Sequence, residues 1–141
     1  MKTKGPRSLW SVLTATVLVG FATSLIGCAS LGPVTPVMVS DVKSVAGTWK
    51  GMLYRSGVRP DYITVTIRED GSYDFVSAQP DGTSRGSGKI VINDGRLRIE
   101  GEKGHGTGTL LRNPAGDLIM NVDAVLSDNS TVSAKLWPAN P

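Results

Sequence analysis

The stretch that decides the fold is YITVTIREDGSYDFVSA, residues 62–78. Its first half places Ile63, Val65 and Ile67 at alternate positions, which is the period-two pattern of a β-strand with one buried face. The EDG sequence at 69–71 is typical of a tight turn, because Gly and Asp readily adopt the positive φ that hairpins need. A second alternating run follows, so the stretch predicts a β-hairpin.

The same pattern recurs on both sides of this hairpin, and sequences rich in Gly, Asn and Asp separate the runs. The eight runs are residues 47–55, 62–69, 72–78, 84–92, 96–101, 105–112, 117–126 and 131–137. Eight strands joined by short turns form an up-and-down meander. A meander with one apolar face buries that face most simply by closing on itself. We therefore expect an all-β domain over residues 41–137, folded as a small eight-stranded barrel.

The N-terminus has the three parts of an export signal: basic residues at 2, 4 and 7, an apolar stretch over 9–26, and small residues after it. Residues 25–28 read LIGC, which resembles the lipobox of bacterial lipoproteins. In that family the cysteine is lipidated and becomes the new N-terminus after cleavage. The resemblance implies that residues 1–27 are a signal peptide and that Cys28, the single cysteine of the chain, carries a lipid anchor to the membrane.

Ala29 follows the cysteine. In lipoproteins of this type an Asp at that position is associated with retention in the inner membrane. The resemblance therefore favours the outer membrane, facing the periplasm, over the inner membrane. Two other interpretations of the segment stay open. In the first, the apolar stretch over 9–26 is an uncleaved transmembrane anchor, although its 18 residues are fewer than the roughly 20 that a spanning helix needs. In the second, Cys28 is a reactive thiol, although no base lies near it in sequence.

Residues 28–40 are uncharged and include Pro33 and Pro36, which predicts an extended, flexible tether between lipid and barrel. Residues 138–141 form a short tail. The whole chain has 15 Lys and Arg against 12 Asp and Glu, and three of the bases belong to the signal. Removing the signal leaves a neutral chain, which argues against a nucleic-acid partner.

The first predicted strand opens with Gly47-Thr48-Trp49, which is similar to the Gly-x-Trp signature of lipocalins and their avidin-like relatives. The resemblance implies a lipocalin-like barrel over residues 41–137, with Gly47 and Trp49 in structural roles and Trp49 plugging the closed end. It also implies a basic side chain over the Trp, for which Arg112 or Lys135 could serve. The biotin-binding aromatics of avidin have no counterpart here, so biotin is not implied.

Two runs carry glycines at every second position, at 86 and 88 and again at 104, 106 and 108. Their parity matches that of the apolar residues in the same runs, so both rows are expected to face inward at the end opposite Trp49. In one interpretation the glycines leave room for a small apolar ligand. The candidate ligand-binding residues are then Phe75, Arg85, Gly88, His105 and Gly106. In the other, the glycines only allow tight coiling of the strands, with Phe75 packed over them.

Catalytic patterns are weak. His105, the one histidine, stands between two glycines with no adjacent carboxylate and no spacing to a second metal ligand. We therefore expect no enzyme activity, no metal and no cofactor. The sequence favours an envelope lipoprotein that binds a small hydrophobic ligand. The alternative is a filled barrel that contacts another envelope protein as an inhibitor or assembly factor.

Overall fold

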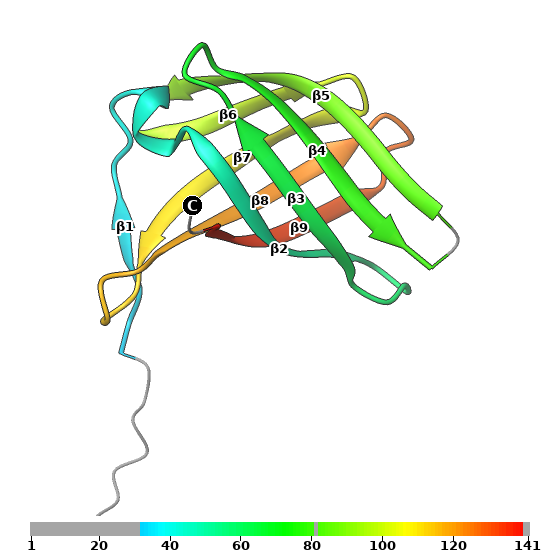
Figure 1. Ribbon diagram of the computed structural model, residues 1–141, viewed down its shortest axis with the longest axis horizontal. Coiled ribbons are helices and arrows are strands. Elements are labelled where there is room, and N and C mark those ends of the chain that lie inside the picture. The colour runs from blue at the N-terminus through cyan, green and yellow to red at the C-terminus, as the bar shows by residue number, and fades with distance from the viewer. Residues whose placement is uncertain (1–31, 81, 140–141) are drawn as a thin grey trace, which may run out of the picture. The chain divides into compact units, whose positions relative to one another are not determined.

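The computed structural model describes residues 32–80 and 82–139, which are built almost entirely from antiparallel β-strands (Figure 1). The one helix within these residues is a short 3₁₀ helix, η1 (Val42–Val45). The strands are β1 (Thr35–Val37), β2 (Gly47–Arg55), β3 (Asp61–Ile67), β4 (Ser72–Gln79), β5 (Gly82–Asn93), β6 (Arg96–Gly101), β7 (Gly104–Arg112), β8 (Leu118–Leu126) and β9 (Thr131–Pro138).

Strands β2 to β9 close into the predicted eight-stranded barrel. Each strand pairs antiparallel with the next one in sequence, and β9 returns to pair with β2 from Trp49↔Pro138 to Arg55↔Val132. All eight strands therefore have a neighbour on both sides. The predicted all-β fold class and up-and-down meander are confirmed, and the predicted strand bounds differ from the observed ones by at most two residues at an end.

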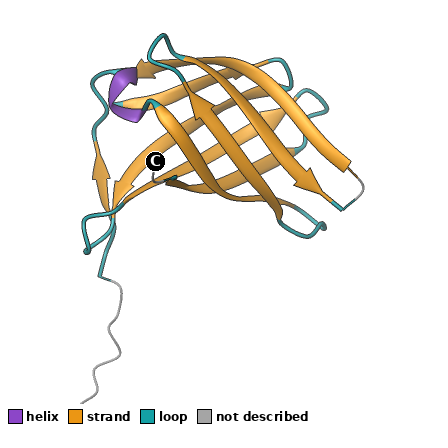
Figure 2. Cartoon of the chain, in the orientation of Figure 1, coloured by secondary structure: helices purple, strands orange, loops and turns teal. Residues whose placement is uncertain are grey.

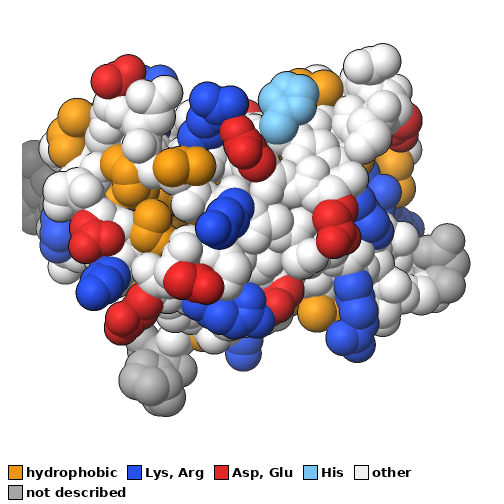
Figure 3. Space-filling view, turned by 90° about the horizontal axis from the view of Figure 1, so that it is seen from above, with side chains coloured by type: hydrophobic (Ala, Val, Ile, Leu, Met, Phe, Trp, Pro, Cys, Tyr) orange, Lys and Arg blue, Asp and Glu red, His pale blue; other side chains and the backbone are white. Residues whose placement is uncertain are grey.

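Alternation along the strands separates a buried inner face from an outer face. The inward residues of the strands form one apolar cluster, whose most buried members include Ile67, Leu97, Met120 and Leu136. On the face that Figure 3 shows, basic and acidic side chains are interspersed.

The described part of the predicted tether packs against the barrel. β1 pairs with the last part of β7, from Thr35↔Arg112 to Val37↔Leu110, and Val39 is buried and donates its N–H to the Gly95 carbonyl. The pairing of β6 with β7 ends before this point, so β1 satisfies backbone groups of β7 that β6 does not reach. A three-residue edge strand that tolerates proline shows no alternation, so the sequence pattern does not reveal β1.

The short helix η1 lies at one end of the barrel (Figure 2). Trp49 is the third residue of β2, which follows η1 directly, so it lies at the same end. Its Nε1–H donates to the Val45 carbonyl at 2.8 Å, and both residues are buried. Gly47, which joins η1 to β2, has a φ of 130° that a residue with a Cβ rarely adopts. Trp49 and η1 together close this end. The two basic residues expected near Trp49 contact other groups: Arg112 donates to the Gly116 carbonyl, and Lys135 lies over the Trp137 ring.

Several hairpin turns have the chemistry that the sequence predicts. Asp94 and Gly95 have φ values of 49° and 73°, the two positive values of a type I′ turn. Two other turns are held by an aspartate. Asp70 accepts from the N–H and hydroxyl of Ser72, and Asp128 accepts from those of Ser130. These hydrogen bonds hold the pKa of both carboxyls below the ordinary value of 3.8.

The signal peptide predicted for residues 1–27, Cys28 and residues 29–31 of the tether lie outside the described residues, as do residues 140–141 of the tail. In the part of the chain that the structure describes, no helix is long and apolar enough to span a membrane.

Candidate functional site

The barrel contains an apolar cavity of about 160 Å³ that extends from its middle toward the end opposite Trp49. Inward side chains of the barrel strands line it because each strand places every second residue inside. The apolar wall includes Leu53, Ile63, Phe75, Met120, Val122 and Ala134. The side chains on the inner face do not fill the whole interior of the barrel, and the space left between them is the cavity.

One end of the cavity is polar, where Arg55 ends β2 and Asp61 begins β3. Each has the parity of inward residues on its own strand, so both side chains enter the barrel. Nη2 of Arg55 lies 2.5 Å from Oδ2 of Asp61, and the side chains are 31% and 3% exposed. A carboxylate buried to this extent is costly without a partner cation. Asp61 therefore holds the Arg55 guanidinium at the rim of the cavity.

Two buried polar atoms on the cavity wall have no hydrogen-bond partner among the described residues: Ser77 Oγ and Arg55 Nε. Ser77 is 1% exposed and lies on β4 between Ile63 of β3 and Ser84 of β5. Buried polar groups in native proteins are nearly always paired, and one left unpaired costs about 1–3 kcal/mol. The hydroxyl and the Nε–H can both donate, so the cavity presents two unused donors.

Other polar groups surround these donors. Lys103, in the β6–β7 turn, donates to Ser84 Oγ at 3.1 Å, and both residues contribute to the cavity lining. Burial of the Tyr73 phenol, with a smaller effect from Glu102, raises the pKa of Tyr73 above its ordinary value of 10.0. Tyr73 also contributes to the cavity lining.

The predicted ligand-binding residues fall in different places. Phe75 lines the cavity from β4, and His105 contributes at the start of β7. The His105 side chain is exposed and also borders a groove outside the barrel. Arg85 lies on the outer face of β5, because its parity is opposite to that of the inward residues of that strand. It does not line the cavity.

Gly88 and Gly106 do not line the interior cavity, and Gly106 borders the groove outside the barrel. A Cβ at Gly88 would collide with the backbone of β6 and lie 2.8 Å from a ring carbon of Tyr73, its cross-strand partner. A Cβ at Gly106 would lie 2.5 Å from a carbonyl oxygen of β8. Phe75 covers Gly86 in the same way. The glycines serve close strand packing, as in the alternative interpretation, and larger side chains wall the cavity.

Sequence reasoning did not single out Arg55, Asp61 or Ser77. Parity carries the signal that would have found them: Arg55 is in phase with Trp49 on β2, and Ser77 is in phase with Phe75 on β4. A polar residue on the apolar parity of a strand must enter the barrel, and such positions are candidates for ligand contacts.

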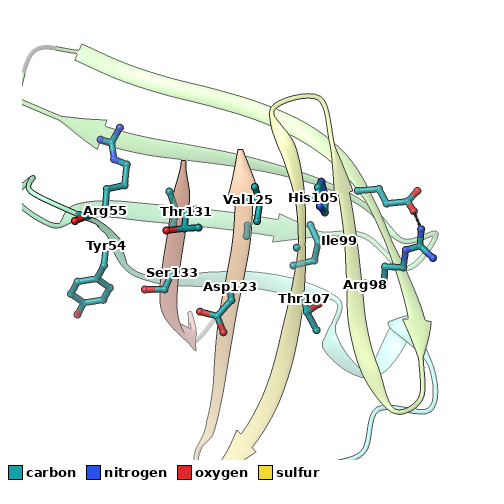
Figure 4. A pocket seen from close by; sticks show the side chains of 15 residues that line it. Tyr54, Arg55, Arg98, Ile99, His105, Thr107, Asp123, Val125, Thr131 and Ser133 are labelled. Atoms are coloured by element: carbon teal, nitrogen blue, oxygen red, sulfur yellow. Dashed lines mark ion pairs between the residues drawn. The ribbon is translucent and has the colours of Figure 1, made fainter. Parts of the chain in front are cut away.

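An open groove lies on the outside of the barrel over β2 and β6–β9 (Figure 4). Side chains that line it include Tyr54, His105 and Asp123, and Arg98 pairs with Glu100 at 2.8 Å. Most of these side chains are exposed, and no three His, Cys, Asp or Glu residues of the described ranges come together to hold a metal ion. The interior cavity is therefore the stronger candidate site.

A scan of the chain against protein-family models finds no match, and a search of curated proteins finds no relative.

Proposed function

We propose that the chain is an envelope lipoprotein, anchored through Cys28, whose lipocalin-like barrel binds a small hydrophobic ligand. The LIGC motif at 25–28 supports the anchor, and Ala29 favours the outer membrane facing the periplasm. In this proposal the chain is a binding protein and not an enzyme. The observation that carries the binding function is the apolar cavity inside the barrel.

The cavity volume limits what can bind. At about 160 Å³ it is close to the size of an engineered 150 Å³ cavity that accepts benzene. It is smaller than the roughly 300–1,000 Å³ of sites for drug-sized ligands. A ligand that fits entirely inside is therefore about as large as one substituted ring or a short branched chain.

Native mass spectrometry of the full-length protein, purified from its own envelope, tests this function. The proposal expects a population carrying a small bound mass. The control is Ala134→Leu, which adds three carbon atoms to the cavity wall, and the bound mass is expected to disappear in this variant. Retention of the adduct in Ala134→Leu, or wild-type protein without any adduct that also takes up no benzene, would contradict the proposal.

A second candidate function, contact with another envelope protein, is favoured by the outer surface of β9, β2 and β3. This surface exposes Tyr54, Tyr62 and Trp137, and Tyr62 is 66% exposed. The three strands are neighbours in the sheet, since Met52 of β2 pairs with Tyr62 of β3 and with Lys135 of β9. Exposed aromatic residues in neighbouring positions are typical of interaction surfaces. Photo-crosslinking in cells from position 62, with position 98 on β6 as the control, tests this candidate. A discrete protein crosslinked from position 62 alone would favour it.

A further inference from the structure

The cavity is chemically asymmetric. Its middle is walled by aliphatic and aromatic side chains such as Ile63, Phe75 and Met120, which offer nothing for a polar atom. The end opposite Trp49 carries Arg55 and Ser77. A ligand that fills the whole cavity must therefore have an apolar part and a polar part in fixed order.

The unpaired groups at that end specify the polar part. Asp61 occupies Nη2 of Arg55, and the Nε–H of Arg55 has no partner within residues 32–80 and 82–139. The Ser77 hydroxyl is 1% exposed, so bulk water does not satisfy it, and it has no partner in the described residues. An acceptor on the ligand is the one kind of group that both atoms can bond, because Arg55 Nε only donates and the Ser77 hydroxyl can donate or accept. An ammonium or another donor group could bond only the Ser77 oxygen and would leave the Arg55 Nε–H unsatisfied.

The charges near these donors do not demand an anion. Arg55 is paired with Asp61, Lys103 donates to Ser84, and Glu102 accepts from Ser87. The formal charges of the two cations and two carboxylates cancel. The common requirement is an accepting oxygen, which a neutral carbonyl or a carboxylate supplies.

We propose that the ligand is a small carbonyl compound or carboxylic acid with an apolar body of about the size of benzene, whose oxygen accepts hydrogen bonds from Ser77 Oγ and Arg55 Nε. This inference rests on the proposed ligand-binding function and adds the chemistry of the head group.

Calorimetric titration of the purified full-length chain with matched probes tests the inference. Acetophenone supplies a neutral acceptor, benzoate an anionic acceptor, benzylamine a cationic donor, and ethylbenzene no head group. Since one hydrogen bond contributes about 0.5–1.5 kcal/mol, the better acceptor probe should bind about 2- to 10-fold more tightly than ethylbenzene. Benzylamine should bind more weakly than ethylbenzene. The ratio of benzoate to acetophenone affinity then separates the two sources of the oxygen.

Ser77→Ala should remove most of the preference for an acceptor and leave ethylbenzene affinity unchanged. The matched control, Ser133→Ala on the outer side of β9, should keep the preference. Arg55→Lys, which retains a cation for Asp61 but loses Nε–H, should weaken the preference. If the wild type binds neither acetophenone nor benzoate more tightly than ethylbenzene, the inference is overturned but the proposed function stays intact. A preference for an acceptor that survives Ser77→Ala has the same consequence. Loss of ethylbenzene binding in Ser77→Ala would assign Ser77 a structural role and also overturn it. Failure of every probe to bind the wild type would overturn the inference and the proposed function together.

Discussion

Adding carbon atoms at two inward positions should have opposite effects, because one position is packed and the other borders the cavity. A Cβ at Gly88 would collide with backbone atoms of β6 and press on the Tyr73 ring. Overpacking of this kind costs about 1–3 kcal/mol, while Gly→Ala recovers about 0.4–1 kcal/mol of chain entropy. The difference between these ranges is about 0–2.6 kcal/mol, and because the collision is with backbone atoms we expect Gly88→Ala to destabilise the fold by about 1–2.6 kcal/mol. Ala134 lines the cavity, so Ala134→Leu buries three further carbons in open space. At about 0.8 kcal/mol per CH₂ the gain is at most about 2.4 kcal/mol, less any rotamer strain.

Thermal melts of both full-length variants, followed by far-UV circular dichroism, measure this contrast. For a domain of this size about 1 kcal/mol corresponds to a shift of roughly 4–8 °C. Gly88→Ala should melt about 4–21 °C below wild type, and Ala134→Leu should melt at or above it. The reverse order, with Gly88→Ala unchanged and Ala134→Leu well below wild type, would refute the assignment of packed and empty regions in the barrel.

Three further predictions concern the closed end, the turns and the anchor. Trp49→Ala should destabilise the fold by about 3–5 kcal/mol in urea unfolding, because it removes a buried aromatic ring. Trp49→Phe keeps a ring but loses the hydrogen bond to the Val45 carbonyl, and should cost about 1 kcal/mol. Equal losses in the two variants would contradict the larger contribution of the buried ring. Because hydrogen bonds lower the pKa of Asp70 and Asp128, the stability that these carboxylates contribute is present above pH 3.8 and is lost as the pH falls through their folded pKa values. The double variant Asp70→Asn, Asp128→Asn should therefore lose less melting temperature than wild type as the pH falls below 3.8. If both proteins lose the same amount, the two carboxylates do not contribute this pH-dependent stability. Cys28→Ala should abolish labelling by radioactive palmitate and leave an unprocessed precursor in cell fractions; a variant that is still labelled and membrane-bound would disprove the lipobox interpretation.

The barrel was predictable because its physical determinants are local. Alternation fixes which residues face inward, and turns such as Asp94-Gly95 have the required positive φ values. The short N-terminal elements were not predictable in the same way. β1 has three residues and η1 has four, too few for any periodicity. Their positions depend on what the barrel leaves unpaired, namely the last part of β7 and the indole N–H of Trp49.

The candidate site shows a similar division. Parity correctly placed the glycine rows inside, but the space above a glycine depends on its cross-strand neighbours. The register pairs Tyr73 with Gly88 and Phe75 with Gly86, so aromatic rings cover both glycines. The turn between β4 and β5 sets this register: Gln79 pairs with Gly82, and counting back along the two antiparallel strands pairs Phe75 with Gly86 and Tyr73 with Gly88. The cavity volume depends on the sizes of inward side chains from many strands together, so no local sequence pattern predicts it.

The most direct test of a ligand site inside the barrel is an NMR titration of the full-length, methyl-labelled chain with benzene, which fits into a cavity of this size and has no head group. We expect saturable shifts of the methyl groups of Leu53, Met120 and Val122, which line the cavity. The outer methyl group of Met52 should not move, and Ala134→Leu should abolish the shifts. Shifts that are absent, or that appear on the outer face and persist in Ala134→Leu, would contradict the account.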